Sequence, residues 1–321
     1  MLDEDRLEML GRVAVWYYEE QIDQSEIARR IKKSRSMVSR MLQEAREQGL
    51  VEIRVSYPLR RDRELEAQLS AAFGLDEALV LANPPRNDYQ GLMARLGRLG
   101  ARYLEQVLHN DMQIGVGWGV TLYNLVSALP QVQINNGLVV QIMGAIGHGD
   151  PLVDGSELAR WLATKLHASY RALPAPLFVE NEATAQSLLQ QPTIADAMRA
   201  ARTVHVALVG IGTIDSRRSG LFRSGYFNSE QISQLREQGV VGDLIGHLLD
   251  RNGQEADVLA NRCIIGESLA ALRATPCVVG LAGESIKAPA ILAVLRGRYL
   301  NVLVTDADTA LAVLELQPQT A

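Results

Sequence analysis

Apolar residues in the first fifty positions recur at helical spacing in three successive segments. The spacing predicts a helix over Leu2–Tyr18 and two shorter helices within residues 24–50, separated by a four-residue break. In the last helix, the positions i, i+3, i+4 and i+7 form one apolar stripe: Val38, Met41, Leu42 and Ala45. Ser34 lies where its hydroxyl can cap that helix. Two short helices joined by a tight turn predict a helix-turn-helix.

The pattern changes after Gly49, a residue type typical of a helix end. Residues 50–57 alternate apolar and polar side chains, which predicts a half-buried strand beside the helices, as in a winged helix-turn-helix. Pro58 closes this first domain, residues 1–58. Residues 59–74 then form a charged helical stretch with a short apolar stripe, Leu65, Leu69 and Ala72, which predicts either a linker or a self-association helix.

From residue 75 to 321, apolar strand patterns alternate with helical ones, including a long helix over Asp88–Val107. The predicted strands are Met112–Gly117, Leu138–Met143, Ala172–Val179, Val204–Val209, Cys277–Ala282 and Leu300–Thr305. Strands separated by helices predict an α/β fold with a mostly parallel, Rossmann-like sheet that is covered on both faces. Asp154 is expected to cap the helix over Ser156–Ser169, with Glu157 completing a capping box.

Composition narrows the classes of protein that are possible. The chain has 32 Lys and Arg against 37 Asp and Glu, a net charge of −5, so any nucleic-acid contact needs a local basic surface. The N-terminus is acidic and no run of 18 apolar residues occurs, so we expect a cytoplasmic protein without a membrane partner. Cys263 and Cys277 lack zinc-ligand spacing, and no cofactor is predicted.

The local basic surface lies in the helix-turn-helix segment. Residues 29–40 contain six Lys or Arg and no acid. A recognition helix needs such donors at its N-terminal end, and lysines in the turn would contact phosphates of double-stranded operator DNA. The candidate DNA-binding residues are Lys32, Lys33, Ser34, Arg35, Ser36, Ser39, Arg40 and Gln43. The alternatives are a solvated basic face, or a helical module that contacts protein.

Glycine-rich loops follow four of the predicted strands, at the edge of the sheet where parallel sheets bind ligands. The loop over residues 115–122 opens a helix, so its N–H groups suit an anion or a row of hydroxyls. A dinucleotide fingerprint fails, because Val120 replaces the third glycine and no acid occurs between Asp111 and Asp150. A P-loop is also missing.

The whole chain resembles the SorC-type (SorC/DeoR) bacterial transcriptional regulators. The resemblance rests on the blocks QSEIARRIKKSRSMVSRMLQEAREQGLV, GVGWGVTL, PAPLFV, VVGDLIGHLLDRNG, AGESIKAPAI and VLVTDADTALAVL, in this order. It implies a ligand-binding domain similar to sugar-phosphate isomerases, a sugar, polyol or sugar-phosphate effector, and a homo-oligomer, either dimer or tetramer. It implies effector contacts at Gly117, Gly119, Thr121, Gly144, Gly147, Gly212, Asp243 and Lys287.

Other interpretations of these residues stay open. Asp243 could accept from sugar hydroxyls or cap a following helix, and Lys287 could bind an anion or lie at the surface. His148 is a further candidate contact, and Trp118 could stack on a sugar or fill the core. Glu284 replaces a glycine of the family pattern, which puts a carboxylate near Lys287.

The charge distribution bears on the effector. No Lys or Arg occurs from Tyr103 to Ala159, the stretch with the first two loops, which slightly favours a neutral polyol or sugar over a phosphosugar. A phosphate would depend on backbone N–H groups, His148, Lys287 and Arg217 or Arg218. We therefore expect a DNA-binding regulator of carbohydrate or polyol genes that is not an enzyme. The alternative is a sugar-phosphate isomerase or deaminase with an added helical module, its base drawn from Asp243, Glu284 or His148.

Overall fold

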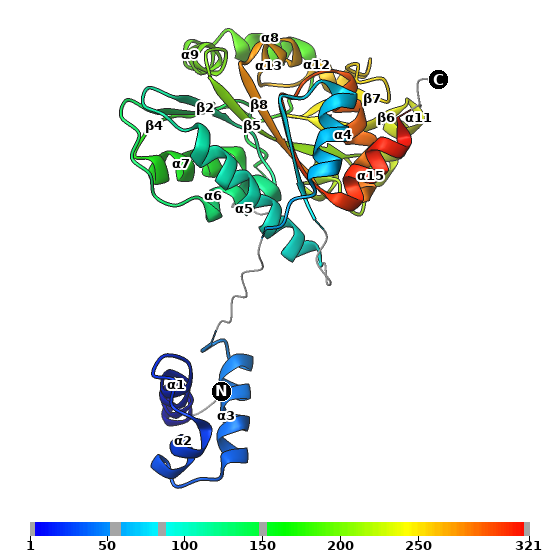
Figure 1. Cartoon of the computed structure of the whole chain (residues 1–321). Coiled ribbons are helices and arrows are strands. Elements are labelled where there is room, and N and C mark those ends of the chain that lie inside the picture. The colour runs from blue at the N-terminus through cyan, green and yellow to red at the C-terminus, as the bar shows by residue number, and fades with distance from the viewer. Residues whose placement is uncertain (1–3, 52–58, 83–87, 148–152, 318–321) are drawn as a thin grey trace. The chain divides into compact units, whose positions relative to one another are not determined.

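The computed structural model describes residues 4–51, 59–82, 88–147 and 153–317. The chain divides into two compact units, residues 1–58 and 59–321. Figure 1 shows the smaller unit, which is helical, and the larger unit, in which helices surround a sheet. The predicted strand after Gly49 falls mainly on residues 52–58, outside the described residues. No helix in the described ranges is both long and apolar enough to cross a bilayer.

The smaller unit consists of α1 (Glu4–Tyr18), α2 (Gln24–Arg30) and α3 (Arg35–Glu47). Asp23 caps α2 by accepting from two N–H groups of its first turn, and Ser34 caps α3 by accepting from Met37 N–H at 3.2 Å. The predicted apolar stripes meet in one core: Leu10, Val13, Ala14, Ile27, Ala28, Val38, Met41, Leu42 and Ala45.

The larger unit is built on a sheet whose parallel strands run in the order β1-β9-β8-β5-β2-β3-β4. The strands are β1 (Glu77–Leu81), β2 (Gln113–Val116), β3 (Leu138–Gln141), β4 (Ser169–Arg171), β5 (Val206–Thr213), β8 (Cys277–Leu281) and β9 (Val302–Asp306). Successive side chains point to opposite faces, as Val139 and Val140 do, and most of them are buried except in the edge strand β4. Both faces are therefore covered, as a parallel sheet requires.

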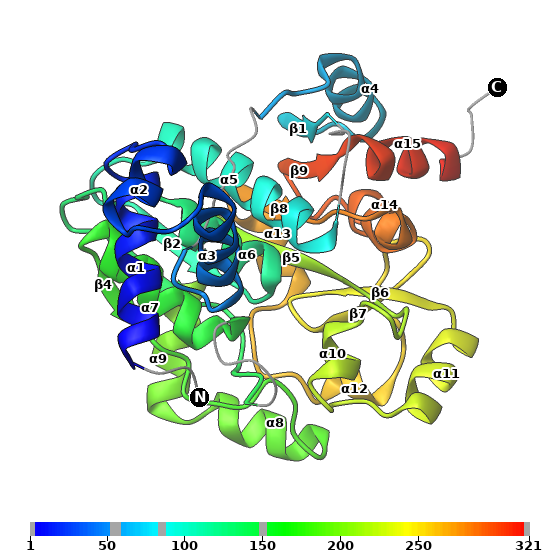
Figure 2. The same cartoon turned by 90° about the horizontal axis from the view of Figure 1, so that it is seen from below.

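Two groups of helices supply these covers (Figure 2). One face packs against α5 (Tyr89–Val107), α6 (Val120–Ala128) and α7 (Gly155–Leu166). The other packs against α4 (Arg63–Phe73), α13 (Leu269–Ala274), α14 (Ala288–Arg296) and α15 (Ala307–Leu316). Most of a satellite core comes from α8 (Glu182–Leu189) and α9 (Pro192–Ala201). Short helices α10 (Gly220–Arg223), α11 (Ser229–Glu237) and α12 (Leu259–Arg262) complete the unit.

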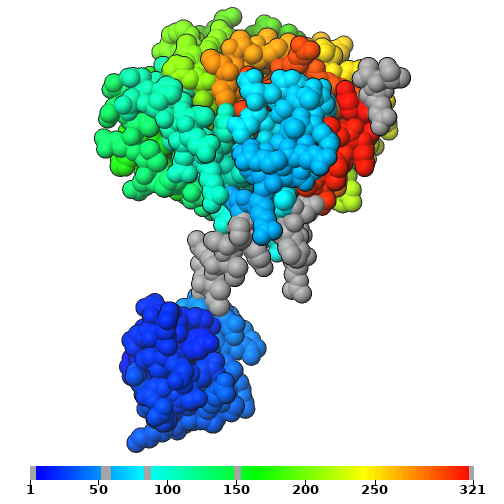
Figure 3. Space-filling view, in the orientation of Figure 1, coloured from blue at the N-terminus to red at the C-terminus, as the bar shows by residue number. Residues whose placement is uncertain are grey.

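The helix α4 belongs to the larger unit. Its apolar residues Leu65 and Leu69 are buried in the core shared with α14 and α15, and α4 packs against β1 and α15. Its other face lies at the surface of the unit (Figure 3). Leu65 and Leu69 of the apolar stripe considered for a linker or for self-association are thus buried within the chain, whereas its third residue, Ala72, is exposed.

A hairpin extends the sheet beyond its parallel part. The end of β5 pairs antiparallel with β6 (Val240–Leu244), which returns as β7 (His247–Asp250). The turn residues Ile245 and Gly246 have φ of +46° and +89°, as a two-residue type I′ turn requires. Asp243 therefore lies in a strand, and the interpretation that it caps a following helix is wrong.

One predicted strand is also wrong. Residues 172–179 form only isolated bridges, Ala145 with Pro176 and Phe178 with Ile264, and the edge strand β4 precedes them. Pro174 and Pro176 lack the N–H groups that a ladder needs, which explains why the apolar pattern does not become a strand. Asp154 caps α7 as predicted, but Glu157 pairs with Arg160 on the same helix.

Candidate functional site

The candidate nucleic-acid surface is formed by α2, α3 and the turn between them. Lys32 adopts φ +52° in this turn, the left-handed conformation for which a glycine is common. Lys33 N–H then donates to Ala28 C=O at 2.9 Å, which closes the end of α2. The turn therefore forms although residue 32 is a lysine and not a glycine. The side chains of Lys32 and Lys33 are both exposed at the N-terminal end of α3.

All eight candidate DNA-binding residues are exposed. Within the described parts of the chain, Lys32, Lys33, Arg35 and Arg40 make no side-chain hydrogen bond or ion pair. By contrast, Gln43 donates to Glu47 at 2.9 Å, and the neighbouring Arg29 and Arg30 both pair with Glu26. The free positive charge is therefore concentrated in the turn and the first two turns of α3.

In the larger unit, a crevice opens where the chain order of the sheet reverses. From β2 the chain proceeds outward to β3 and β4, then returns to β5 on the other side of β2. The loops beyond β2 and β5 thus diverge, which is the usual ligand position in such sheets. The crevice is lined by Tyr89, Met93, Trp118, Gly119, Val120, Thr121, Val153, Gly210, Ile211, Gly212, Arg218, Gly220, Arg223, Asp243 and Lys287.

The N-terminus of α6 forms one wall of the crevice. Gly119 caps this helix with φ +123°, a conformation that a side chain would strain, and its N–H donates to Val153 C=O at 3.0 Å. The first intrahelical donor is the N–H of Tyr123, so residues 120–122 present N–H groups with no partner in the helix. Such a terminus attracts negative charge.

Asp243 and Lys287 form the opposite wall. A Cβ at Gly212 would lie only 1.8 Å from Asp243 Oδ1, so the carboxylate occupies the space that this glycine leaves free. Burial raises the pKa of Asp243 to about 6, although the charge of Lys287 and a hydrogen bond from Gly246 N–H oppose the shift. Lys287 Nζ donates to Ile211 C=O at 2.8 Å, and burial lowers the pKa of its ammonium group.

Comparison with known proteins gives the chain its family. A model described as "Putative sugar-binding domain" matches residues 57–315. The deoxyribonucleoside regulator of Bacillus subtilis (strain 168) is 32% identical over 313 residues, covering 98% of this chain and 99% of the relative. The sorbitol operon regulator of Klebsiella pneumoniae is 30% identical over 317 residues, covering 98% and 100%. The chain belongs to the SorC-type family of transcriptional regulators.

Solved structures agree with this assignment. The full-length sorbitol operon regulator SorC from Klebsiella pneumoniae superimposes with a TM-score of 0.73 at 29% identity, covering 97% of this chain and 100% of that one. The crystal structure of a sugar-binding domain of a transcriptional repressor from Vibrio fischeri has a TM-score of 0.71 at 29% identity, covering 79% and 99%. The α/β fold with its parallel sheet is therefore that of SorC-type structures.

The structure brings together five of the nine predicted effector residues of this SorC-type chain: Gly119, Thr121, Gly212, Asp243 and Lys287. The Thr121 hydroxyl donates to Leu281 C=O at 3.2 Å, so toward an effector it can act only as an acceptor. Trp118 lines the crevice and packs its ring against Gly220. His148 lies outside the described residues.

Three predicted glycines do not line the crevice. Gly117 N–H donates to Leu208 C=O at 2.9 Å, and Gly144 N–H donates to Ile265 C=O at 2.8 Å. Gly147 is exposed and donates to Asp154 Oδ2 at 3.2 Å. Their N–H groups fix loop structure, so the prediction that these glycines contact the effector finds no support in this geometry.

Sequence patterns missed part of the cationic lining. Arg223 was not predicted, and Arg218 was named only as one possible phosphate contact; both belong to residues 214–228, between β5 and α11. Tyr89, from the first turn of α5, was also missed as a lining residue. Two consecutive arginines followed by a third five residues later were the available signal. The described residues contain no cluster of three His, Cys, Asp or Glu side chains that could bind a metal ion.

Proposed function

We propose that this transcriptional regulator binds operator DNA through α2, α3 and their turn, and that a sugar, polyol or sugar phosphate bound in the crevice modulates this binding. Family membership supports the regulatory role. Exposed and unpaired cations at the start of α3 support DNA contact. A crevice with hydrogen-bonding groups on two walls supports a polyhydroxylated effector.

In this proposal Lys32 and Lys33 contact phosphates, which sets the register of α3 in the major groove. The exposed face of α3 then meets base edges. That face, together with its cap, comprises Ser34, Arg35, Ser36, Ser39, Arg40 and Gln43.

The double substitution Arg35→Ala and Arg40→Ala tests the DNA surface. We expect weaker binding to a random-sequence duplex, and a slope of log K against log salt that is smaller by about 1 for each phosphate that is no longer neutralised. Fluorescence anisotropy at several salt concentrations measures both quantities. Arg12→Ala is the matched control, because Arg12 is an exposed arginine of α1 that pairs with Glu8. Unchanged affinity in the double variant would favour the protein-contact alternative.

We further propose that the effector has an anionic group, contrary to the slight preference for a neutral ligand in the sequence. That preference rested on the two loops before residue 159. Among the described residues that line the crevice, Arg218, Arg223 and Lys287 are cations, and Asp243 is the one acid. Arg218 pairs with Glu284, which leaves Arg223 and Lys287 against Asp243. The open N-terminus of α6 adds partial positive charge. A phosphorylated sugar or polyol fits this balance better than a neutral one.

A thermal-shift screen against matched pairs of sugars, polyols and their phosphates tests the effector class. A ligand at a hundred times its dissociation constant adds about 2.7 kcal/mol to the unfolding free energy. We expect shifts from phosphates and none from their neutral counterparts. Shifts from neutral polyols alone would contradict the anionic effector, and no shift from any compound would contradict the carbohydrate assignment.

The regulator is proposed to act as a homo-oligomer, a dimer or tetramer, because a helix-turn-helix protein reads two half-sites through twofold symmetry. We propose that it acts in the cytoplasm, together with its DNA partner. Leu65 and Leu69 of α4 are buried within the chain, so these two side chains are not available to join the copies. Light scattering of the full-length chain measures the mass directly, and a monomer would contradict the proposal.

One observation favours the enzymatic alternative enough to test it. Asp243 combines a pKa of about 6 with a place beside Lys287 in the crevice, a combination that general bases use. We propose that the pair serves effector binding. Proton exchange of a phosphosugar in deuterated water, followed by NMR with the wild-type chain, decides between the two. Exchange that disappears in Asp243→Asn would establish an enzyme.

A further inference from the structure

Glu284 has a backbone conformation that is rare for any residue except glycine. Its φ and ψ are +74° and 126°, at the start of the short 3-10 helix Ser285–Lys287. Glu284 N–H donates to Asp306 Oδ2 at 3.1 Å, and Glu284 C=O accepts from Lys287 N–H at 2.9 Å. The surrounding structure therefore holds a strained residue in place, and its carboxylate is fixed with it.

That carboxylate binds Arg218 and not Lys287. Arg218 Nη2 donates to Glu284 Oε1 at 2.8 Å, and Arg218 Nε donates to Glu284 Oε2. The guanidinium also lies 4.3 Å from the centre of the Tyr89 ring. Only 30% of the Arg218 side chain and 24% of the Glu284 side chain are exposed. A bidentate, partly buried pair stacked on an aromatic ring is strong and geometrically specific.

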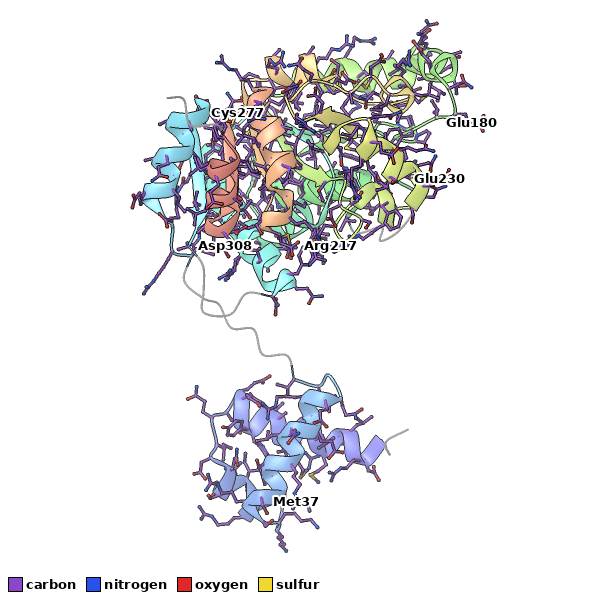
Figure 4. The ribbon with its side chains drawn as sticks, turned by 90° about the vertical axis from the view of Figure 1, so that its right-hand side faces the viewer. Met37, Glu180, Arg217, Glu230, Cys277 and Asp308 are labelled. Carbon is purple, nitrogen blue, oxygen red and sulfur yellow. The ribbon has the colours of Figure 1, made fainter. Side chains whose placement is uncertain are left out.

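The pair lies between the crevice and a second, more open cleft. Tyr89 and Arg218 line both spaces. The other residues of the outer cleft are Asp88, Leu92, Arg217, Glu284, Ser285, Ile286, Asp306 and Asp308. Figure 4 labels two of them, Arg217 and Asp308, on the same side of the larger unit. Arg218, Glu284 and Tyr89 therefore form a partition at one end of the effector crevice.

We infer that Glu284 determines effector specificity by occupying Arg218, so that the crevice accepts an effector with one anionic group and rejects one with two. A carboxylate presents two oxygens to a guanidinium as a phosphate does. A second anionic group of an effector would have to displace Glu284 and would then lie beside its negative charge. Arg223 and Lys287 remain for the first group. This inference rests on the proposed anionic effector.

The test uses the full-length chain and inorganic pyrophosphate, which needs cations but no sugar recognition. Glu284→Gln keeps the size of the side chain and removes its charge. We expect its pyrophosphate dissociation constant, measured by calorimetry, to fall at least about tenfold, with inorganic phosphate affected less than about threefold. In the double variant Glu284→Gln with Arg218→Met, the gain should vanish. Glu284→Gly, which the positive φ favours, is a second variant that should show the same gain.

The outcomes separate this inference from the proposed function. An unchanged pyrophosphate affinity in both Glu284 variants, or a gain that persists without Arg218, would overturn the role of Glu284. Failure of every phosphosugar to shift the wild-type midpoint would contradict the proposed effector, yet the pyrophosphate comparison would still decide the role of Glu284. Equal gains for phosphate and pyrophosphate would show general relief of repulsion and would also overturn the inference.

Discussion

Asp243 should give the larger unit a specific dependence of stability on pH. Its side chain is 4% exposed, and its pKa is about 6 compared with 3.8 in an unfolded chain. Because the folded state binds this proton more tightly, the stabilisation is complete below pH 3.8 and is lost as the pH rises through about 6. One pKa unit corresponds to 1.36 kcal/mol, so ionisation of Asp243 lowers the unfolding free energy by about 3 kcal/mol.

Asp243→Asn removes this titration while keeping the shape of the side chain. Between about pH 4 and pH 6.5, we expect the variant to gain about 3 kcal/mol of unfolding free energy relative to wild type. We compare the two proteins only within this pH range, because loss of Asp243 also lowers the pKa of Lys287. Urea unfolding followed by tryptophan fluorescence measures the difference. A Trp16→Phe background confines the signal to Trp118 and Trp161 of the larger unit, since the chain has three tryptophans.

The control is Asp257→Asn, which removes a carboxyl that is 98% exposed and should leave the pH profile of wild type unchanged. Parallel profiles for wild type and Asp243→Asn would show that the carboxyl is solvated in solution. The desolvation argument for the crevice would then be wrong.

Three further substitutions test the packing of the two units. Gly212→Ala puts a Cβ 1.8 Å from Asp243 Oδ1, so we expect the unfolding free energy measured in urea to fall by about 1–3 kcal/mol. The thermal shift that the effector causes should also disappear. Gly11→Ala, whose Cβ would meet no atom within 4 Å in α1, should instead stabilise by about 0.5–1 kcal/mol. Leu69→Ala in α4 should cost about 2–5 kcal/mol by calorimetry, and a change of oligomer mass without destabilisation would contradict its packing inside the larger unit.

Helices and strands were predictable from the sequence where burial of one or both faces imposes a regular spacing of apolar residues. The stripe of α3, from Val38 to Ala45, is buried in the structure as predicted, and five of the six predicted strands coincide with strands of the parallel sheet. The hairpin of β6 and β7 was not predicted, because Ile245 occupies a type I′ turn position that normally signals itself by Asn or Gly. Residues 172–179 were misassigned because apolar composition outweighed two prolines.

The loops around the crevice were likewise predictable only in part. Loops after β2, β5 and β8 meet there because strand order and the polarity of a parallel sheet bring their ends together. Among the described residues of the loop after β3, only Val153 lines the crevice, and the loop's Gly144 and Gly147 serve local hydrogen bonds. A single sequence could not distinguish these cases, since each of the four loops contains glycine.

The charged side chains of the crevice have a different origin from its backbone N–H groups. N–H groups at the start of α6 result from the fold itself, because any helix in that place presents them. Arg218 and Arg223 come from residues 214–228, which no strand or long helix constrains. Glu284 occupies a position where the backbone has a positive φ, and the fold sets no other requirement on the residue there. The fold therefore fixes a general site for hydroxyls or one anion, whereas a few side chains, most of them outside the strands and the long helices, set its charge. Members of one fold family can thus differ in effector without any change in the sheet.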